Sequence, residues 1–381
     1  MASTAEFVFV TCQCGAEAAL KRELARLWPA WRFAFSRPGF VTFKQPQPTA
    51  PADNFALRST LARSYAISLG CVRGSSASQR ARQVWEVAAG RPIDRLHVWS
   101  RETTLPGTNG YEPGLDEVAL QARQQILDAA PASLADAAAR QRWQHPTRRG
   151  DLVLDCVLVE PDQWWIGYHR ASARATRWPG GIWPGQPPAE MVSRAYLKTS
   201  EALDWMALPI KPGQRCVELG CAPGGSTQAL LDRGLRVTGV DPANVDPRIA
   251  QHPNFQHVRK RGADVQRKEY GQFQWLIADM NVAPRYTLDT VRDIVTHRLV
   301  RIRGVLLNLK LADWTLAEQV PQYMAEVRGW GYPVVRARQL SYQRHEICVA
   351  GLAVPSRRRR RGSHRRAVRA TSASKPAANR G

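Results

Sequence analysis

The alternation of apolar and polar positions divides the first 170 residues into two predicted α+β units. Residues 1–52 have the pattern of a small βαββ unit, with a strand at 7–12, an amphipathic helix at 15–28 and a hairpin at 32–44. Residues 53–170 follow with helical patterns at 78–89 and 115–130 and strand patterns at 96–101, 152–159 and 164–169. We therefore expect two small domains ahead of the rest of the chain.

A different pattern begins after residues 171–188, a segment rich in glycine, proline, arginine and tryptophan that we interpret as a linker. Residues 189–354 open with a predicted helix at 189–207, after which short apolar strands alternate with helices. The strands are predicted at 215–219, 235–241, 274–280, 304–310 and 345–352. This alternation is typical of a Rossmann-like α/β domain with a parallel, doubly wound sheet.

The net charge points to a polyanionic partner. The 381 residues include 54 Lys and Arg against 32 Asp and Glu, which gives a formal net charge of +22. Nine Arg and one Lys follow Pro355, so residues 355–381 are expected to form a basic, disordered tail, and the rest of the chain still carries +12. A field of this strength makes nucleic acid the first partner to consider.

Membrane and disulfide-bonded proteins do not fit the sequence. No stretch of about 18 apolar residues is present to cross a bilayer, and the N-terminus lacks the features of a secretory signal. The seven cysteines are scattered, without a Cys-x-x-Cys pair or a zinc-like spacing, so neither a disulfide framework nor a metal site is expected. We expect a cytoplasmic protein that does not bind membranes, and we favour a monomer.

The most informative motif is a glycine-rich turn between an apolar strand and a helix. It reads Gly220-Cys221-Ala222-Pro223-Gly224-Gly225-Ser226. Glycines let the backbone approach a ligand closely, and the start of the following helix presents free N–H groups. A dinucleotide site requires Gly-x-Gly-x-x-Gly, which is absent because Cys221-Ala222-Pro223 separates the glycines. The turn therefore favours a methyltransferase with a nucleoside cofactor over a nicotinamide-dependent dehydrogenase.

Two acidic residues after the turn are candidates for cofactor contacts. Asp241 ends the next predicted strand, where an acid commonly accepts hydrogen bonds from ribose hydroxyls. Asp264 lies in the following loop and is a candidate for the adenine amino group, although an ordinary turn residue explains it nearly as well.

Four ionisable residues are expected to meet at one edge of the sheet. Asp279 and Lys310 close apolar strands, Lys198 lies on the preceding helix and Glu346 begins the last strand. Ligands of open α/β sheets bind at the carboxyl ends of the strands. Each residue alone is readily explained as a surface charge, but the four together indicate a catalytic site.

Methyl transfer from a sulfonium to a hydroxyl requires alignment of the oxygen and removal of its proton. A ribose 2′-hydroxyl is a poor acid and needs a base close by. Lys310 fits that role if the like charge of Lys198 and partial burial lower its pKa. Asp279 is then expected to orient Lys310, and Glu346 to balance Lys198 or to hold the ribose.

At these residues the chain resembles the FtsJ-type 2′-O-ribose RNA methyltransferases. Their Lys-Asp-Lys-Glu catalytic tetrad is matched by Lys198, Asp279, Lys310 and Glu346. Further similar strings are Ser193-Arg194-Ala195-Tyr196-Leu197-Lys198, Asn308-Leu309-Lys310-Leu311 and Ala337-Arg338-Gln339-Leu340. The resemblance covers most of the chain up to about residue 352.

The resemblance implies a class I fold that uses S-adenosylmethionine, with a ferredoxin-like unit and an RNA-binding THUMP domain ahead of it. It implies methyl transfer to a cytidine 2′-hydroxyl of 23S ribosomal RNA or a ribosomal precursor, with Lys310 as proton acceptor. Ser193, the turn Ala222–Gly225, Asp241 and Asp279 are placed at the cofactor. On the adenine side, Arg261 aligns where the family has an acid and Asp264 follows three residues later, so both positions stay open.

Two other kinds of function remain open. A catalytically silent RNA-binding scaffold would keep the same fold, although the complete tetrad argues against it. A methyltransferase acting on protein or small molecules would leave the positive charge of the chain unexplained.

Overall fold

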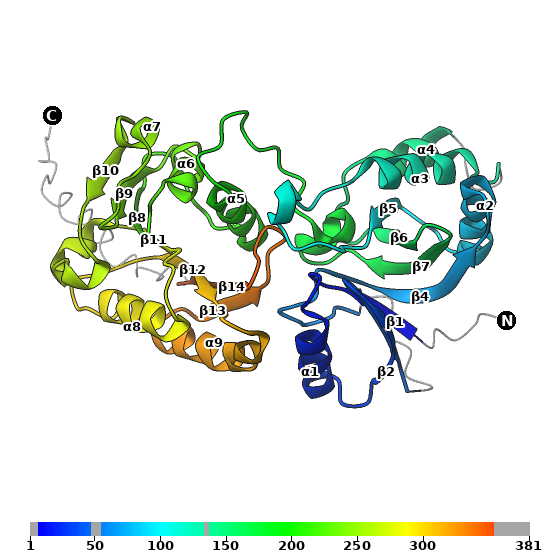
Figure 1. Ribbon diagram of the computed structural model, residues 1–381, viewed down its shortest axis with the longest axis horizontal. Helices are drawn as coiled ribbons and strands as arrows, with labels where there is room; N and C mark the ends of the chain where they lie inside the picture. Colours follow the sequence, from blue (N-terminus) through cyan, green and yellow to red (C-terminus); the bar gives the residue numbers. More distant parts are fainter. Residues whose placement is uncertain (1–6, 47–54, 133–136, 354–381) are drawn as a thin grey trace, which may run out of the picture.

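The computed structural model describes residues 7–46, 55–132 and 137–353, without the side chains of 137–140, and contains two seven-stranded sheets (Figure 1). The predicted tail, residues 355–381, lies outside the described residues. One sheet belongs to the N-terminal region and the other to the C-terminal region. Among the described residues, no helix combines the length and the apolar character needed to cross a bilayer.

The N-terminal sheet has the strand order β2-β3-β1-β4-β7-β6-β5. The predicted βαββ unit is present as β1 (Phe7–Thr11), α1 (Glu17–Leu27), β2 (Arg32–Arg37) and β3 (Phe40–Lys44). The remaining elements are β4 (Ser64–Arg73), α2 (Ala77–Ala88), β5 (Arg95–Ser100), η1 (Thr108–Gly110), α3 (Glu117–Asp128), α4 (Ala137–Gln144), β6 (Leu152–Glu160) and β7 (Gln163–Arg170). Because β4 pairs with both β1 and β7, the sheet is continuous across the boundary expected at residue 52.

Strand β4 was missed by the sequence pattern because an irregularity interrupts its alternation. Its register with β7 shifts between Ser68 and Gly70, and Gly70 has a φ of 130°. Such a bulge moves the following side chains to the opposite face, so the period of two is lost along the strand.

The C-terminal sheet has the strand order β10-β9-β8-β11-β12-β14-β13. Its elements are α5 (Ala195–Met206), β8 (Arg215–Leu219), α6 (Gly225–Leu231), β9 (Arg236–Val240), α7 (Pro247–Ala250), β10 (Phe255–Val258), η4 (Gly262–Asp264), η5 (Arg267–Gln272), β11 (Trp275–Ala278), α8 (Pro284–Val295), β12 (Gly304–Lys310), η6 (Trp314–Gln319), α9 (Val320–Gly329), β13 (Val334–Arg338) and β14 (Glu346–Leu352). Helices α5 and α6 cover one face of the sheet, and α8 and α9 cover the other (Figure 1). This arrangement confirms the predicted Rossmann-like domain.

The expectation of a parallel sheet was wrong at one strand. β14 runs antiparallel to both β12 and β13. The connection from β13 to β14 spans residues 339–345, which is too short for the crossover of a dozen or more residues that parallel neighbours require. The last strand therefore returns as a hairpin and begins at the edge where β12 ends.

The predicted linker is packed against the C-terminal domain. It contains the short turns η2 (Ala175–Arg177) and η3 (Pro179–Gly181), and Trp183 is buried with its indole N–H donating to Asp204 at 2.7 Å. Helix α5 begins at Ala195, six residues later than the predicted start at 189. The tryptophans in this segment therefore act mainly in packing.

Buried polar side chains join the two regions. The Arg63 guanidinium donates to the carbonyl of Ser341 at 2.9 Å. The amide of Gln339 donates to the side-chain oxygen of Gln13 at 2.9 Å. These contacts fix the N-terminal sheet to the segment between β13 and β14.

Candidate active site at the carboxyl ends of the C-terminal sheet

The four predicted catalytic side chains meet at one edge of the C-terminal sheet. Lys198 lies on α5, Asp279 follows β11, Lys310 ends β12 and Glu346 begins β14. The backbones of Lys310 and Glu346 are directly paired, because an antiparallel strand places its first residue opposite the last residue of its neighbour. The hairpin topology of β14 therefore brings the acid to the lysine.

The four side chains form a closed set of ion pairs. Lys198 Nζ lies 2.8 Å from Asp279 Oδ2 and 3.1 Å from Glu346 Oε2. Lys310 Nζ lies 3.3 Å from Asp279 Oδ1 and 3.1 Å from Glu346 Oε2. Each carboxylate thus contacts both ammonium groups.

The two lysines differ in their environments. The Lys198 side chain is 9% exposed, whereas that of Lys310 is 25% exposed. Burial alone lowers the pKa of Lys198, but the charges of Asp279 and Glu346 outweigh burial and raise it. Lys198 is therefore held in its charged form, and Lys310 is the lysine of the set that reaches solvent.

Asp279 is ionised between the two lysines. Burial alone raises the pKa of its carboxyl group, but Lys198 and Lys310 outweigh burial and lower it. Its backbone N–H donates to the carbonyl of Leu219 at 3.0 Å, which fixes it beside the end of β8. The site thus contains a fixed negative charge next to the glycine-rich turn.

The glycine-rich turn packs against the backbone of Asp279, the residue that follows β11. Gly220 has a φ of 79°, and a Cβ there would lie 2.9 Å from the carbonyl oxygen of Asp279. A Cβ on Gly225 would overlap the hydroxyl of Ser193, which places this predicted cofactor residue against the turn. The Ala222–Pro223 peptide bond is cis. Side chains at these glycines would fill the space along the turn.

Asp241 lies at the same edge and holds the turn through its carboxylate. The backbone N–H of Ala222 donates to Asp241 Oδ2 at 3.1 Å, and that of Ala243 donates to Oδ1 at 2.8 Å. Ser193, the turn, Asp241 and Asp279 are therefore brought together as the sequence predicted. These features fit a nucleoside cofactor lying along the ends of β8 and β9.

The adenine-side candidates lie farther along the same edge. Arg261 precedes η4 and Asp264 ends it, and both side chains are exposed. The backbone N–H of Asp264 donates to the carbonyl of Arg261 at 2.9 Å. A cofactor contact by Asp264 stays a prediction.

Glu201 is a buried acid that the sequence analysis missed. It lies on α5, three residues after Lys198, and its carboxylate accepts three hydrogen bonds of 2.7–2.9 Å from the N–H and hydroxyl of Ser341. Ser341 lies in the segment that leads to Glu346. Glu201 thus connects the helix that carries Lys198 to the segment that leads to Glu346. The sequence signal that could have identified it is an acidic residue on the buried face of α5.

Glu218 is a second buried acid that was missed, although it lies only two residues before the glycine-rich turn. It is fully buried on β8 and accepts a hydrogen bond from the Thr227 hydroxyl at 2.6 Å. Burial raises the pKa of its carboxyl group to about 8. The protonated carboxyl group therefore joins β8 to the start of α6.

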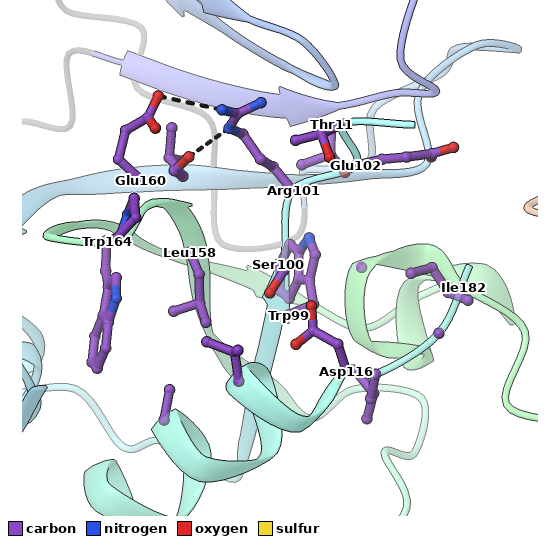
Figure 2. A pocket seen from close by; sticks show the side chains of 18 of the residues that line it. Thr11, Trp99, Ser100, Arg101, Glu102, Asp116, Leu158, Glu160, Trp164 and Ile182 are labelled. Atoms are coloured by element: carbon purple, nitrogen blue, oxygen red, sulfur yellow. Dashed lines mark hydrogen bonds and ion pairs between the residues drawn. The ribbon is translucent and has the colours of Figure 1, made fainter. Parts of the chain in front are cut away.

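A cavity of about 610 Å³ lies in the N-terminal region and contains none of the predicted site residues. Figure 2 shows Arg101 directed towards Glu160, with Trp164 and Leu158 across from Asp116. Trp99 and Trp164 line the cavity but are 2% and 3% exposed, and the Arg80 guanidinium covers the Trp164 ring at 4.7 Å. Neither ring offers a free face for stacking.

Comparison with known proteins places the site in a familiar family. Residues 191–320 match the FtsJ-like methyltransferase family. This segment contains Lys198, the glycine-rich turn, Asp241, Asp279 and Lys310, whereas Glu346 lies beyond it. The match confirms the predicted methyltransferase domain and its cofactor, S-adenosylmethionine.

Several curated proteins are similar over part of the chain. The ribosomal RNA large subunit methyltransferase M of Halorhodospira halophila is 33% identical over 187 residues, which cover 48% of this chain and 53% of that protein. The protein of that name from Laribacter hongkongensis is 30% identical over 197 residues, covering 48% and 54%. The chain therefore spans about half the length of the curated relatives it matches. The family match covers about a third of the chain, and residues 191–320 are similar to FtsJ-like methyltransferases.

Proposed function

We propose that the protein is an S-adenosylmethionine-dependent RNA methyltransferase that modifies a ribose 2′-hydroxyl. The observation that carries this proposal is the convergence of Lys198, Asp279, Lys310 and Glu346 beside the glycine-rich turn. The similarity to large-subunit ribosomal RNA methyltransferases supports ribosomal RNA of the large subunit as the target. A cytidine of 23S ribosomal RNA, free or in a precursor, is the finer proposal and rests on the resemblance of the sequence motifs.

In this proposal Lys310 is the general base. S-adenosylmethionine supplies a methyl group on a positively charged sulfur, which needs no further activation. Lys310, once deprotonated, would take the proton of the 2′-hydroxyl, and bound S-adenosylmethionine would supply the methyl group to that oxygen. The other three side chains hold it in place, since Lys310 Nζ contacts both carboxylates and Lys198 balances their charge.

Cofactor binding is assigned to the residues that surround the turn. We propose that Ser193, Gly220, Ala222, Pro223, Gly224 and Gly225 line the cofactor, with Asp241 at its ribose, Asp264 at its adenine and Asp279 near the methionine end. The contacts of Asp241 with the turn and of Asp279 with Gly220 support this assignment. The Asp264 contact is the part that rests on sequence position alone.

We also propose that the N-terminal region binds RNA, with residues 1–52 as a ferredoxin-like unit and 53–170 as a THUMP-like domain. Residues 171–188 would connect them to the catalytic domain at 189–354. Two contacts with the catalytic domain support this role: Glu112 pairs with Arg194, which directly precedes α5, and Arg344 Nε donates to the carbonyl of Pro106 at 2.5 Å. RNA held by the N-terminal region would thus lie close to Glu346.

The test is methyl transfer from radiolabelled S-adenosylmethionine to unmodified 23S ribosomal RNA, followed by nuclease mapping. We expect label in an alkali-resistant dinucleotide, and none with Lys310→Ala. Lys268→Ala is the matched control, because this exposed lysine of the same domain lies outside the tetrad. Cofactor binding without label on any RNA would contradict the proposal and favour a non-RNA substrate or a silent scaffold.

A further inference from the structure

A stacked pair of rings lies beside the tetrad, where β12 ends and β14 begins. The rings of Trp314, in η6, and His345, directly before β14, have centroids 5.0 Å apart and planes 30° apart. The backbone N–H of Leu311 donates to the carbonyl of His345 at 2.8 Å, so the strand pairing continues one residue beyond Lys310 and Glu346. The ring pair is therefore fixed to the same two strand ends that carry part of the tetrad.

The ring pair and the tetrad side chains lie on opposite faces of the sheet. Successive side chains of a strand point to opposite faces, so Leu311 and Lys310 point away from each other. Leu311 and Trp314 pack in the core with residues of α8 and α9. Lys198 contacts the carboxylates shared with Lys310 from α5, which covers the other face. The ring pair and Lys310 are thus separated by the edge of the sheet.

The outer ring of the pair belongs to His345. This residue is exposed, whereas Trp314 is half-buried against the core. Within the part of the chain that the structure describes, the His345 ring forms no hydrogen bond or ion pair and stacks on no ring besides Trp314. In contrast, Phe55 contacts both rings of the stacked pair Trp28–Trp31, at centroid distances of 5.1 and 5.8 Å. The stack of Trp314 and His345 is therefore open at its outer end.

Helix α1 of the N-terminal region borders the inner side of the pair. Arg22 Nε of α1 lies 2.7 Å from Glu318 Oε1 of η6. A cavity of about 340 Å³ lies between the two elements and is lined by Trp314 and by Arg26, which forms no ion pair with a described residue. The ring pair therefore lies at the junction between the N-terminal region and the catalytic domain.

We propose that the outer face of the His345 ring stacks on a base of the RNA substrate that flanks the nucleotide to be methylated. This inference rests on the proposed function. Unpaired RNA bases stack on aromatic side chains, histidine included, because every base has a flat π-face. A flanking base is indicated because the edge of the sheet separates the ring pair from Lys310. Trp314 is a positioning residue that holds the His345 ring, and neither residue takes part in the proton transfer.

The test measures kcat/KM for unmodified 23S ribosomal RNA and the Kd of S-adenosylmethionine in variants of His345. Loss of one stacked base weakens binding by about 5- to 150-fold. We expect His345→Ala to lower kcat/KM about tenfold and to leave the Kd of the cofactor unchanged. His345→Phe keeps an aromatic ring and should retain most of the activity. His345→Leu keeps apolar bulk without a π-face and should lose as much activity as His345→Ala, which separates stacking from packing.

Matched controls come from the same domain. Trp330 is half-buried against the same core as Trp314 but follows α9, and His297 lies between α8 and β12. Trp314→Ala should lower kcat/KM for RNA as His345→Ala does, whereas Trp330→Ala and His297→Ala should leave it unchanged.

Three results would overturn the inference. They are wild-type kcat/KM in His345→Ala, a loss in His345→Phe as large as in His345→Ala, and an equal loss in the control variants. In each of these cases the wild-type chain still methylates RNA, so the proposed function stands. A wild-type chain that methylates no RNA would overturn the proposed function itself.

Discussion

Two buried clusters of ionisable side chains, one in each sheet, have opposite relations to solvent. The tetrad lies at strand ends, and its Lys310 side chain is 25% exposed. In the N-terminal sheet, Asp155 is fully buried within β6, with its Oδ2 2.5 Å from His169 Nδ1 and its Oδ1 3.8 Å from His97 Nδ1. A cluster of ionisable side chains is thus open to solvent in one region and sealed from it in the other.

The sealed cluster is completed by protein partners. His169 Nε2 lies 2.7 Å from the carbonyl of Thr176, and His97 Nε2 lies 2.7 Å from the Thr147 hydroxyl. Burial alone lowers the pKa of His169, but the charge and hydrogen bond of Asp155 outweigh burial and raise it. The comparison teaches that a buried cluster of charged side chains indicates a catalytic or binding site only where one of these side chains is still accessible to a ligand.

The largest expected effect is on catalysis by the open cluster. Lys310→Ala should lower methyl transfer by about 10³-fold, because the 2′-hydroxyl loses its base. The free energy of unfolding should fall less than for Asp155→Ala, since the Lys310 side chain reaches solvent and Lys198 still contacts both carboxylates. Single-turnover assays and urea denaturation measure the two quantities. A loss of stability as large as that expected for Asp155→Ala would contradict the contrast between the two clusters.

The sealed cluster should respond in the opposite way. Asp155→Ala leaves His169 buried without its carboxylate, and the free energy of unfolding should fall by about 3–5 kcal/mol. The methyl-transfer rate per folded molecule should stay unchanged, and Asp155→Asn should give a smaller loss of stability. Urea denaturation with parallel assays tests this expectation. A large fall in the rate of the folded protein would assign the cluster a role in function.

Glu218 extends the contrast to a sealed acid on β8, next to the glycine-rich turn. Its folded-state pKa of about 8 lies above its ordinary value of 4.5, so the folded protein keeps a proton that the unfolded chain releases. Stability should therefore fall as pH rises from 4.5 to 8, by about 1.4 kcal/mol per pH unit. Glu218→Gln should remove this component when unfolding is measured at pH 5.5, 7 and 8.5. An unchanged slope would show that Glu218 is ionised in the folded protein.

The smallest expected effect concerns Glu201, which is sealed like Asp155 but lies one helical turn from Lys198. Glu201→Gln keeps the shape of the side chain and weakens its hydrogen bonds to Ser341, so kcat should fall about three- to tenfold. The KM for S-adenosylmethionine should change little, because the turn is held by other residues. A loss confined to stability, with unchanged kcat, would make Glu201 a purely structural residue.

Much of the candidate site was predictable because its signals are local. The glycine-rich turn, Asp241 and the strand-end positions of Asp279 and Lys310 depend on residues close in sequence, and strand ends of an α/β sheet share one edge. Glu201 was not predictable, because its partner Ser341 is 140 residues away. Strand β4 was missed because a bulge at Gly70 breaks the alternation on which the prediction depends.

The sequence by itself determined the type of C-terminal domain, the identity of the tetrad and the strong positive charge. Only the tertiary structure decided that β14 reverses direction, which sets Glu346 beside Lys310. It also decided which charge cluster is sealed by protein partners and which reaches solvent. The physical reason is that residue type and spacing act along the chain, whereas burial and ion pairing depend on neighbours that the fold brings together.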